Sequence, residues 1–210
     1  MKKIAVLISG SGSNLQAIID NTSNGFIQGK VSVVISNKKD AYGLERAKNH
    51  HIPNYFISFK EAGTAEKYDA QILQLLEKYE IDCVVLAGYL RILTPKFIAQ
   101  YENRIINIHP SLLPSFGGHG FYGEKVHEAV LEYGAKVSGA TVHFVDNGTD
   151  TGPIILQDTV YVANEDTPKT LQQRILRIEH QLLPLAVKMY CENKIKITKI
   201  ESKRTKVEIV

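Results

Sequence analysis

Short apolar, β-branched runs recur along the chain up to residue 145, and amphipathic stretches separate the first five of them. Runs that are apolar at successive positions are typical of strands buried on both faces. Strands that alternate with helices indicate a parallel sheet covered on both sides. The runs are KIAVLIS, VSVVIS, NYFIS, DCVVLAG, RIINIH and GATVHFV, and the helical stretches are Asn14 to Ser23, Tyr42 to His51, Thr64 to Tyr79 and Pro95 to Tyr101. We therefore predict an α/β fold with a doubly wound, mostly parallel sheet and helices on both faces.

The pattern changes in the C-terminal part of the chain. VHEAVLEYG predicts a helix that ends at Gly134, and SGATVHFVDNGTDTGPIILQDTVYV contains two strand-like runs around a polar turn. A long helix follows from about Thr167 to Glu192, with Thr167 as N-cap and Pro168 in its first turn. The alternation of Ile195 and Ile197 with Val207 and Ile209 indicates a terminal β-hairpin. We expect an added ribbon, a long helix and a hairpin within a single domain, residues 1–210.

Composition narrows the class of protein. The chain has 210 residues, two cysteines and a net charge of +3, which fits one compact domain without a disulfide framework, in a reducing cytoplasm. The N-terminal apolar run is too short for a signal peptide, and no run is long enough for a membrane span. The last 17 residues hold six basic against two acidic residues. We interpret these lysines as charges that prevent an exposed strand edge from pairing with another chain, and we expect no nucleic-acid or membrane partner.

In a doubly wound sheet, ligands bind beyond the carboxyl ends of the strands. The segments at these ends are Ser9 to Asn14, Ser36 to Asp40, Gly88 to Arg91 and Asn107 to Pro114. We expect the functional site to be built from them.

The glycine-serine turn after the first strand, SGSGSN, opens a helix. Unpaired backbone N–H groups and the helix dipole make such a turn an anion site. It lacks the third glycine of a dinucleotide fingerprint and the lysine of a nucleotide-triphosphate loop. Gly12, Ser13 and Asn14 therefore suit a terminal phosphomonoester; the alternative is a plain strand-to-helix turn capped by Asn14.

The segment IINIHPSLLPSFGG contains the residues best suited to chemistry. Asn107 and His109 lie at positions i and i+2 of a strand end, so both side chains project from the same face. An amide beside an imidazole can stabilise negative charge that develops on a carbonyl oxygen. Downstream, Asp146 and Asp150 lie in one loop, and a carboxylate next to His109 would raise its pKa and fix its tautomer. For an isolated aspartate near glycine, a turn that bonds its own backbone is the alternative.

Metal and covalent chemistry are not indicated. The other candidate histidines lie in helical patterns, a strand or a loop, and none has a metal-ligand spacing. They are His119, His127, His143 and His180. No serine, cysteine or threonine lies in a nucleophile-elbow context. Direct group transfer without a metal is the favoured hypothesis.

Several motifs in the same order resemble a known enzyme family over essentially the whole chain. They are VLISGSGSNLQAII, ISNKKDAYGLERA, VVLAGYLRIL, NIHPSLLPSF, HEAVLEYGAKVSGATVHFVDNGTDTGPIILQ and the EH before LLP. The chain resembles the folate-dependent phosphoribosylglycinamide formyltransferases of purine biosynthesis. The resemblance implies the formyltransferase fold and transfer of the formyl group of the co-substrate 10-formyltetrahydrofolate to the amino group of 5-phosphoribosylglycinamide.

The resemblance also assigns site residues. Asn107, His109 and Asp150 match the family's catalytic Asn, His and Asp, which leaves Asp146 as a loop acid. The substrate phosphate and ribose would be bound by Gly12, Ser13, Asn14 and Glu179. The folate would be bound by Leu90, Arg91, Ile92, Leu93, Asn107, Asn147, Gly148, Thr149 and Asp150.

The chain departs from the family pattern in three places. Ala65 stands where some relatives carry a basic residue associated with the folate site, and Lys67, two positions further along the helix, is expected to point in another direction. Leu176 replaces a glutamine found in some members. The GGHGFYGEKVH segment is longer than in short relatives, and its His127 aligns with a family histidine whose role here stays open.

Three alternatives share some of these features. Methionyl-tRNA formyltransferases and formyltetrahydrofolate deformylases carry a similar Asn, His and Asp set, but the first normally has an extra C-terminal RNA-binding domain and the second an N-terminal regulatory domain. Chain length and the SGSGSN turn favour the ribonucleotide enzyme. A ribose-phosphate-binding module without chemistry is the non-enzyme alternative, since fold alone does not determine function.

Overall fold

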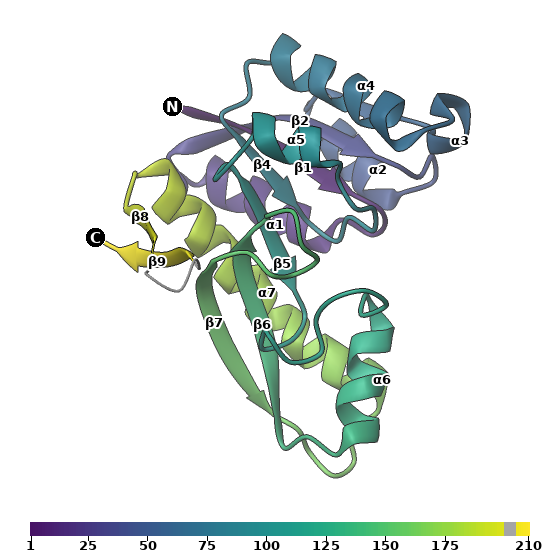
Figure 1. Ribbon diagram of the computed structural model, residues 1–210, viewed down its shortest axis with the longest axis vertical. Helices are drawn as coiled ribbons and strands as arrows, with labels where there is room; N and C mark the ends of the chain where they lie inside the picture. The colour runs from purple at the N-terminus through teal and green to yellow at the C-terminus, as the bar shows by residue number, and fades with distance from the viewer. Residues whose placement is uncertain (200–204) are drawn as a thin grey trace. The chain divides into compact units, whose positions relative to one another are not determined.

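A computed structural model describes residues 1–199 and 205–210 of the chain (Figure 1). The chain forms two compact units, Met1–Asn107 and Ile108–Val210. One sheet has seven strands in the order β3-β2-β1-β4-β5-β6-β7, and β8 and β9 form a second, two-stranded sheet. The boundary between the units falls inside β5 (Ile105–His109).

Unit 1 alternates strands with helices as predicted. Its elements before β5 are β1 (Lys2–Ile8), α1 (Ser13–Ser23), β2 (Gly29–Ser36), α2 (Tyr42–Asn49), β3 (Asn54–Phe56), α3 (Phe59–Ala62), α4 (Ala65–Lys78), β4 (Cys83–Leu86) and α5 (Pro95–Gln100). All strand pairs among β1 to β5 are parallel. The strand order reverses direction between β3 and β4, which is the topology of a doubly wound sheet.

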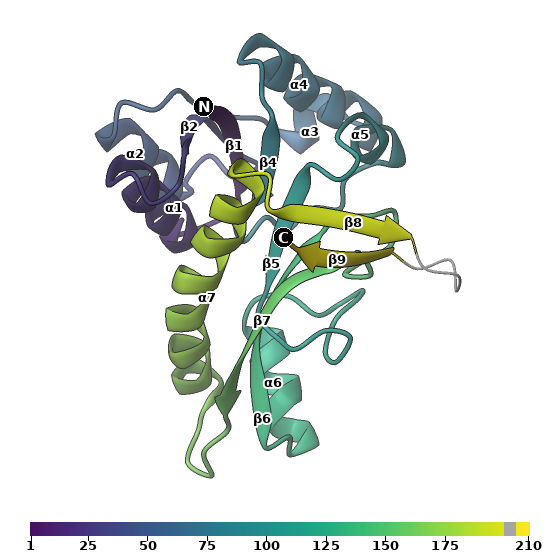
Figure 2. The same ribbon diagram turned by 90° about the vertical axis from the view of Figure 1, so that its left-hand side faces the viewer.

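The strands of unit 1 are apolar on both faces because helices cover both. Figures 1 and 2 show α1 and α2 on one face and α4 and α5 on the other. The β1 residues from Ile4 to Ile8 are fully buried. Because every strand here runs in the same direction, the loops that follow β1 and β4 emerge at one end of the sheet.

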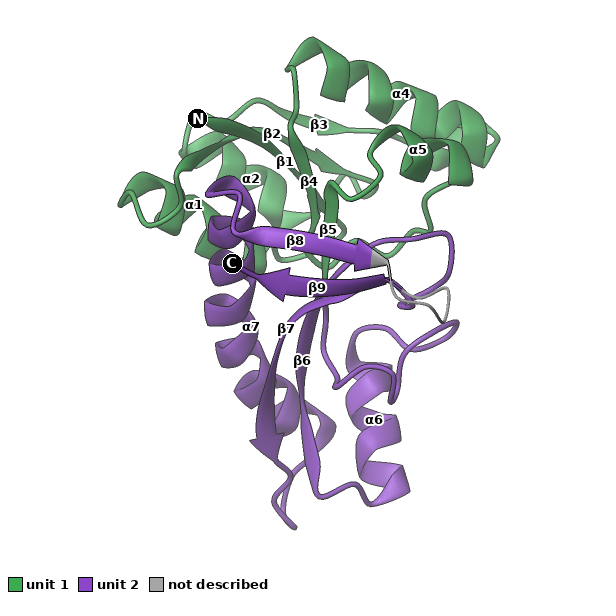
Figure 3. Ribbon diagram, turned by 60° about the vertical axis from the view of Figure 1, so that its left-hand side comes forward, with its two compact units in different colours: residues 1–107 green, residues 108–210 purple. Residues whose placement is uncertain are grey.

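Unit 2 is built around an antiparallel pair, seen in Figure 3 in purple. Its elements after β5 are α6 (Glu124–Tyr133), β6 (Val137–Phe144), β7 (Ile154–Tyr161), α7 (Pro168–Cys191), β8 (Ile195–Lys199) and β9 (Thr205–Ile209). The long helix α7 contacts β6, β7 and α6. β6 and β7 pair antiparallel, with Thr141 opposite Gln157.

The predicted helix ends of unit 2 are confirmed. Gly134 caps α6 in the left-handed conformation, with φ of 74°. The Thr167 side chain accepts a hydrogen bond from the amide of Thr170, and Pro168 occupies the first turn of α7.

The predicted terminal hairpin is confirmed for the described residues. Ile195 lies opposite Ile209, and Ile197 lies opposite Val207. The part of the basic tail at residues 200–204, which includes Lys203 and Arg204, lies outside the described residues. Among the described residues no helix combines the length and the apolar character that crossing a membrane requires.

Candidate active site

The loop after β1 makes the predicted turn, but Asn14 is not its cap. Gly12 is the N-cap of α1 and is left-handed, with φ of 70°, and no side chain caps the helix. The amide of Gln16 donates to the Gly12 carbonyl at 2.9 Å, and Asn14 is buried in the first turn. The alternative of a turn capped by Asn14 is therefore wrong. Backbone N–H groups of an uncapped first turn remain suited to an anion.

A close approach between two glycines fixes this loop against the start of α2. A Cβ on Gly12 would lie 2.6 Å from Cα of Gly43, and the Gly43 amide donates to the Gly10 carbonyl at 3.1 Å. Arg46 of α2 donates from Nε to the Ser11 carbonyl at 2.9 Å. The turn thus has a guanidinium beside it, which the sequence motif did not reveal, and this charge favours an anionic guest.

The loop after β4 contains the predicted folate segment, Leu90 to Leu93. The Leu90 amide donates to Ser9 Oγ at 2.9 Å, which joins this loop to the end of β1. Leu90 and Ile92 are about half and two-thirds exposed, whereas Leu93 is buried. The Arg91 guanidinium carbon lies 3.4 Å from the centroid of the Phe59 ring. The segment therefore presents two exposed apolar side chains and one cation held against an aromatic ring.

β5 carries Asn107 and His109 two residues apart, as predicted, at the end of unit 1 and the start of unit 2 respectively. His109 is buried, and its Nδ1 lies 3.5 Å from Oδ2 of Asp150. Nε2 of His143 lies 3.6 Å from the other oxygen, Oδ1, of the same carboxylate. Unit 2 thus places one carboxylate between two buried imidazoles.

Backbone groups of the loop after β5 hold this cluster. Nε2 of His109 lies 2.9 Å from the Phe116 carbonyl, and the Gly118 amide donates to Oδ2 of Asp150 at 3.0 Å. A carbonyl can only accept, so Nε2 of His109 carries a proton. Nδ1 is then the nitrogen that faces the carboxylate.

Thr141 of β6 fastens the beginning of this loop. Its hydroxyl donates to the Ser111 carbonyl at 2.6 Å and accepts from the Leu113 amide at 3.0 Å. Nε2 of Gln157 donates to both Thr141 Oγ1 and the Leu113 carbonyl. The two buried bonds of Thr141 and the two half-buried bonds of Gln157 give the loop a rigid start.

Burial has the largest effect on the pKa of His109. Burial lowers the pKa of His109, and the Asp150 carboxylate and the Phe116 carbonyl offset this only in part. The predicted effect of a neighbouring carboxylate is confirmed, since Asp150 raises the pKa of His109, but burial outweighs it. Burial also opposes ionisation of Asp150, but the interactions with His143, His109 and the Gly118 amide outweigh it and lower its pKa. The cluster holds an ionised carboxylate beside an imidazole that loses its proton readily.

His143 is a member of this cluster that the sequence analysis set aside as a strand histidine. It is buried, and its Nδ1 lies 2.8 Å from the Phe144 carbonyl. A signal was present, since His143 lies seven residues before Asp150 in the strand that leads into that loop. Its spacing to other histidines and cysteines fits no metal site, which favoured the interpretation as an ordinary strand residue.

The loop from β6 to β7 contains the remaining predicted folate residues. Asn147, Gly148 and Thr149 are exposed, and Asp150 has a positive φ of 58°. Asp146 accepts from the Gly148 amide at 3.1 Å and from the Thr151 hydroxyl at 2.6 Å. Its interpretation as a loop acid is confirmed, because its carboxylate serves the turn itself.

Two further predicted positions lie on helices of unit 2. Glu179 is buried on α7, and His127 is buried on α6. Burial and then the charge of His109 lower the pKa of His127 to about 4. The described residues contain no cluster of three or more His, Cys, Asp or Glu side chains suited to a metal ion.

The chain matches known proteins over most of its length. A family model described as formyl transferase matches residues 2–187. A phosphoribosylglycinamide formyltransferase of Haemophilus influenzae is 43% identical over 94% of this chain and 91% of its own. The crystal structure of glycinamide ribonucleotide transformylase 1 from Symbiobacterium toebii has a TM-score of 0.92 and 43% identity, covering all of this chain and 94% of that one.

A formyltetrahydrofolate deformylase from Pseudomonas syringae is more distant. It has a TM-score of 0.87 and 27% identity, and the match covers 99% of this chain but 65% of that one. Sequence identity and mutual coverage are both higher for the transformylase structure than for the deformylase structure. The sequence motifs, the seven-stranded sheet and the family match over residues 2–187 agree, and the chain belongs to the formyl transferase family.

Proposed function

We propose that this chain transfers the formyl group of 10-formyltetrahydrofolate to the amino group of 5-phosphoribosylglycinamide, giving the formylglycinamide ribonucleotide and tetrahydrofolate. We propose further that residues 1–210 act as one formyltransferase domain in the cytoplasm. The observation that carries the proposal is the pairing of buried His109 with half-buried Asp150 in a chain of this family. The deformylase, the methionyl-tRNA formyltransferase and the binding-module alternatives have less support from the relatives.

In the proposed mechanism the substrate amine attacks the formyl carbon, and negative charge develops on the formyl oxygen. Asn107 and His109 stabilise this oxyanion by hydrogen bonding. Asp150 is ionised because its pKa is lowered, so it can accept the proton that the amine loses. The proton then moves to the nitrogen of tetrahydrofolate as the tetrahedral intermediate collapses.

The proton on Nε2 of His109 constrains how His109 can donate to the substrate. Its Nε2 proton is donated to the Phe116 carbonyl before substrate binds. Donation to the formyl oxygen therefore requires either exchange of this bond or protonation of Nδ1, which faces Asp150. The nearby carboxylate favours the protonated form once negative charge develops on the substrate.

The ribonucleotide phosphate would bind at the first turn of α1. The backbone N–H groups of Gly12, Ser13 and Asn14 supply donors, and no side-chain cap competes for them. Arg46 adds a positive charge beside the turn. Glu179 would bind the ribose hydroxyls, for which a carboxylate is a suitable acceptor.

The folate would be bound by Leu90 to Leu93 of unit 1 and by Asn147 to Asp150 of unit 2. The exposed side chains of Leu90 and Ile92 suit an apolar ring system. Arg91 forms no ion pair with a carboxylate among the described residues, and it stacks on Phe59. This cation is available to the carboxylates of the folate glutamate.

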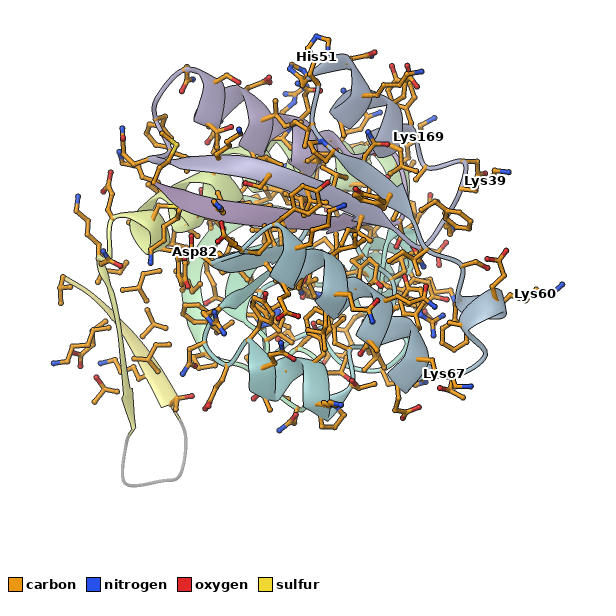
Figure 4. All side chains as sticks on the ribbon, turned by 90° about the horizontal axis from the view of Figure 1, so that it is seen from above. Lys39, His51, Lys60, Lys67, Asp82 and Lys169 are labelled. Atoms are coloured by element: carbon orange, nitrogen blue, oxygen red, sulfur yellow. The ribbon has the colours of Figure 1, made fainter. Side chains whose placement is uncertain are left out.

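Two more cations lie on the same unit. Lys60 on α3 and Lys67 on α4 are exposed, and Figure 4 labels both. Ala65 occupies the first turn of α4 beside them. We propose that Arg91, with Lys60 or Lys67, supplies the basic group that position 65 lacks.

Production of tetrahydrofolate from 10-formyltetrahydrofolate tests the reaction, with 5-phosphoribosylglycinamide present or absent. Turnover that requires the ribonucleotide supports the proposal. Formate release without it would instead make the chain a deformylase, and formylation of methionyl-tRNA would make it a tRNA enzyme. Ribonucleotide binding without any turnover would leave a binding module.

Replacement of His109 tests the site. We expect His109→Ala to lower kcat about 100-fold or more, because proton transfer and oxyanion stabilisation each contribute on this scale. His119→Ala is the matched control, since His119 lies exposed in a loop. Near wild-type kcat in a folded His109→Ala protein would refute the assignment.

A further inference from the structure

Asp69 is a buried acid of unit 1 that the proposed reaction does not use. It lies on α4, is only 3% exposed, and shares the buried face of that helix with Tyr68, Ile72, Leu73 and Leu76. A carboxylate in an apolar helix face is unfavourable unless its oxygens are bonded, because it loses its hydrogen bonds to water. Its hydrogen bond therefore identifies its role.

The Asp69 carboxylate bonds the main chain where the loop after β4 meets α5. Its Oδ2 accepts a hydrogen bond from the Thr94 amide at 2.7 Å. Thr94 is the N-cap of α5, since its hydroxyl accepts from the Phe97 amide at 3.3 Å and Pro95 occupies the first turn. A hydrogen bond from an amide to a carboxylate is stronger than one between neutral groups. Asp69 thus fixes the end of the loop that contains Leu90 to Leu93.

Tyr68, the neighbour of Asp69 on α4, contacts the middle of the same loop. The Tyr68 hydroxyl lies 2.9 Å from that of Tyr89, and both side chains are buried. The Arg91 guanidinium carbon lies 5.3 Å from the centroid of the Tyr68 ring, in addition to its contact with Phe59 of α3. Successive residues of a helix point about 100° apart. Tyr68 and Asp69 therefore hold the loop at different points along its length.

The loop depends on such contacts for its conformation. Residues 87–94 form neither helix nor strand. The side chains of Leu90 and Ile92 are exposed by 50% and 66%, so their own packing does not fix the loop. A loop that a ligand must order loses conformational entropy on binding, and this cost is smaller when the loop is already held in place.

We propose that Asp69 is a positioning residue for the folate co-substrate. Because its side chain is buried, it acts through the Thr94 amide and not by touching the folate. The bond holds Leu90 to Leu93 in the conformation that binds the folate. This inference rests on the proposed function, in which that segment binds the co-substrate.

Equilibrium binding separates this role from a general loss of structure. The Kd of the full chain is measured by calorimetry for tetrahydrofolate and, separately, for 5-phosphoribosylglycinamide. We expect Asp69→Ala to weaken tetrahydrofolate binding about 10-fold, because it removes a hydrogen bond to a charged group. The Kd for the ribonucleotide should not change, since the glycine-serine turn after β1 is not part of this loop. Asp69→Asn keeps an oxygen acceptor without its charge, so it should weaken tetrahydrofolate binding only about 3-fold.

Asp82→Ala is the matched control. Oδ2 of Asp82 also accepts from a main-chain amide at 2.7 Å, that of Lys3, but Asp82 lies before β4, at the opposite end of the strand from the loop (Figure 4). Asp82→Ala should therefore leave the Kd for tetrahydrofolate unchanged. Without ligand, hydrogen exchange at the Thr94 amide should be faster in Asp69→Ala and unchanged in Asp82→Ala.

Three results would overturn the proposal. They are wild-type tetrahydrofolate binding by a folded Asp69→Ala chain, an equal loss of ribonucleotide affinity in that variant, and an equal loss of tetrahydrofolate affinity in Asp82→Ala. If Asp69→Ala does not fold, Asp69→Asn decides, and wild-type tetrahydrofolate binding by Asp69→Asn would overturn the proposal.

The wild-type chain distinguishes failure of this inference from failure of the proposed function. A wild-type chain that binds no tetrahydrofolate would overturn the proposed function and this inference with it. Tetrahydrofolate binding by the wild type, combined with any of the results above, would overturn the role of Asp69 alone.

Discussion

His127 makes the stability of unit 2 depend on pH in a way that can be calculated. Its pKa is lowered from an ordinary value of 6.5 to about 4, mainly because the imidazole is 1% exposed. The unfolded chain then binds a proton in acid that the folded chain does not, so the free energy of unfolding falls as the pH falls below 6.5. Between pH 7 and pH 5 this one group costs about 2 kcal/mol.

Two other groups, His109 and Asp150, also make the free energy of unfolding depend on pH. Burial lowers the pKa of His109 too, so His109 adds a loss of the same sign. Asp150 acts in the other range: its lowered pKa stabilises the fold above its ordinary value of 3.8, and this contribution is lost only as the pH falls through the lower, folded value. The change in the free energy of unfolding between pH 7 and pH 5 therefore comes from the histidines rather than from Asp150.

Urea unfolding at pH 7, 6 and 5 measures the effect in the wild type and in His127→Leu. We expect the variant to lose about 2 kcal/mol less than the wild type between pH 7 and pH 5, because leucine cannot be protonated. His119→Leu is the control and should follow the wild type, since His119 is exposed. Equal losses in the wild type and His127→Leu would refute the argument that burial controls this titration.

The same contacts support three further predictions. Asp150→Asn should lower kcat about 100-fold or more with an unchanged circular dichroism spectrum, because an amide cannot accept the amine proton; a smaller loss would assign that proton to another base. His143→Gln should shift the acid limb of the kcat/KM profile to higher pH, because it removes an interaction that lowers the pKa of Asp150. An unshifted acid limb would show that His143 does not influence the titration of Asp150. Gly12→Ala should raise KM for the ribonucleotide, because its Cβ would lie 2.6 Å from Cα of Gly43 and the backbone is left-handed there. Gly10→Ala, whose Cβ would meet nothing within 4 Å, should change KM little, and equal effects of the two glycine variants would contradict the steric argument.

Elements with a strong local signal could be predicted from the sequence. The strands of unit 1 are apolar at nearly every position, and α7 begins with both a threonine cap and a proline. The helix α3, with only four residues, was missed because one turn has no measurable periodicity. The hairpin was recognised because its two strands alternate in the same way.

The site could be predicted only where a motif names the residue. Asn107, His109 and Asp150 were found through such motifs, and their roles in catalysis stay predictions. His143 and Arg46 were not found, because their importance comes from which residues the fold places beside them. The effect of Asp150 on the pKa of His109 was predicted with the correct sign, but the larger and opposite effect of burial was not predicted, because the sequence does not show how deeply His109 is buried.

The segment from Phe116 to Gly118 holds His109 and Asp150 by main-chain atoms alone, and this bears on how the enzyme can evolve. A carbonyl is present whatever side chain a position carries, so a substitution at 116 can keep the bond to His109 if the backbone path is kept. The two glycines that follow are more restricted: Gly118 has a positive φ of 94°, which an L side chain rarely adopts, and a Cβ on Gly117 would lie 2.3 Å from a methyl group of Leu113 and 3.4 Å from Cβ of Asp150. Selection at this segment therefore acts on the backbone conformation, and the side chain at 116 can vary while the geometry of His109 and Asp150 stays constant.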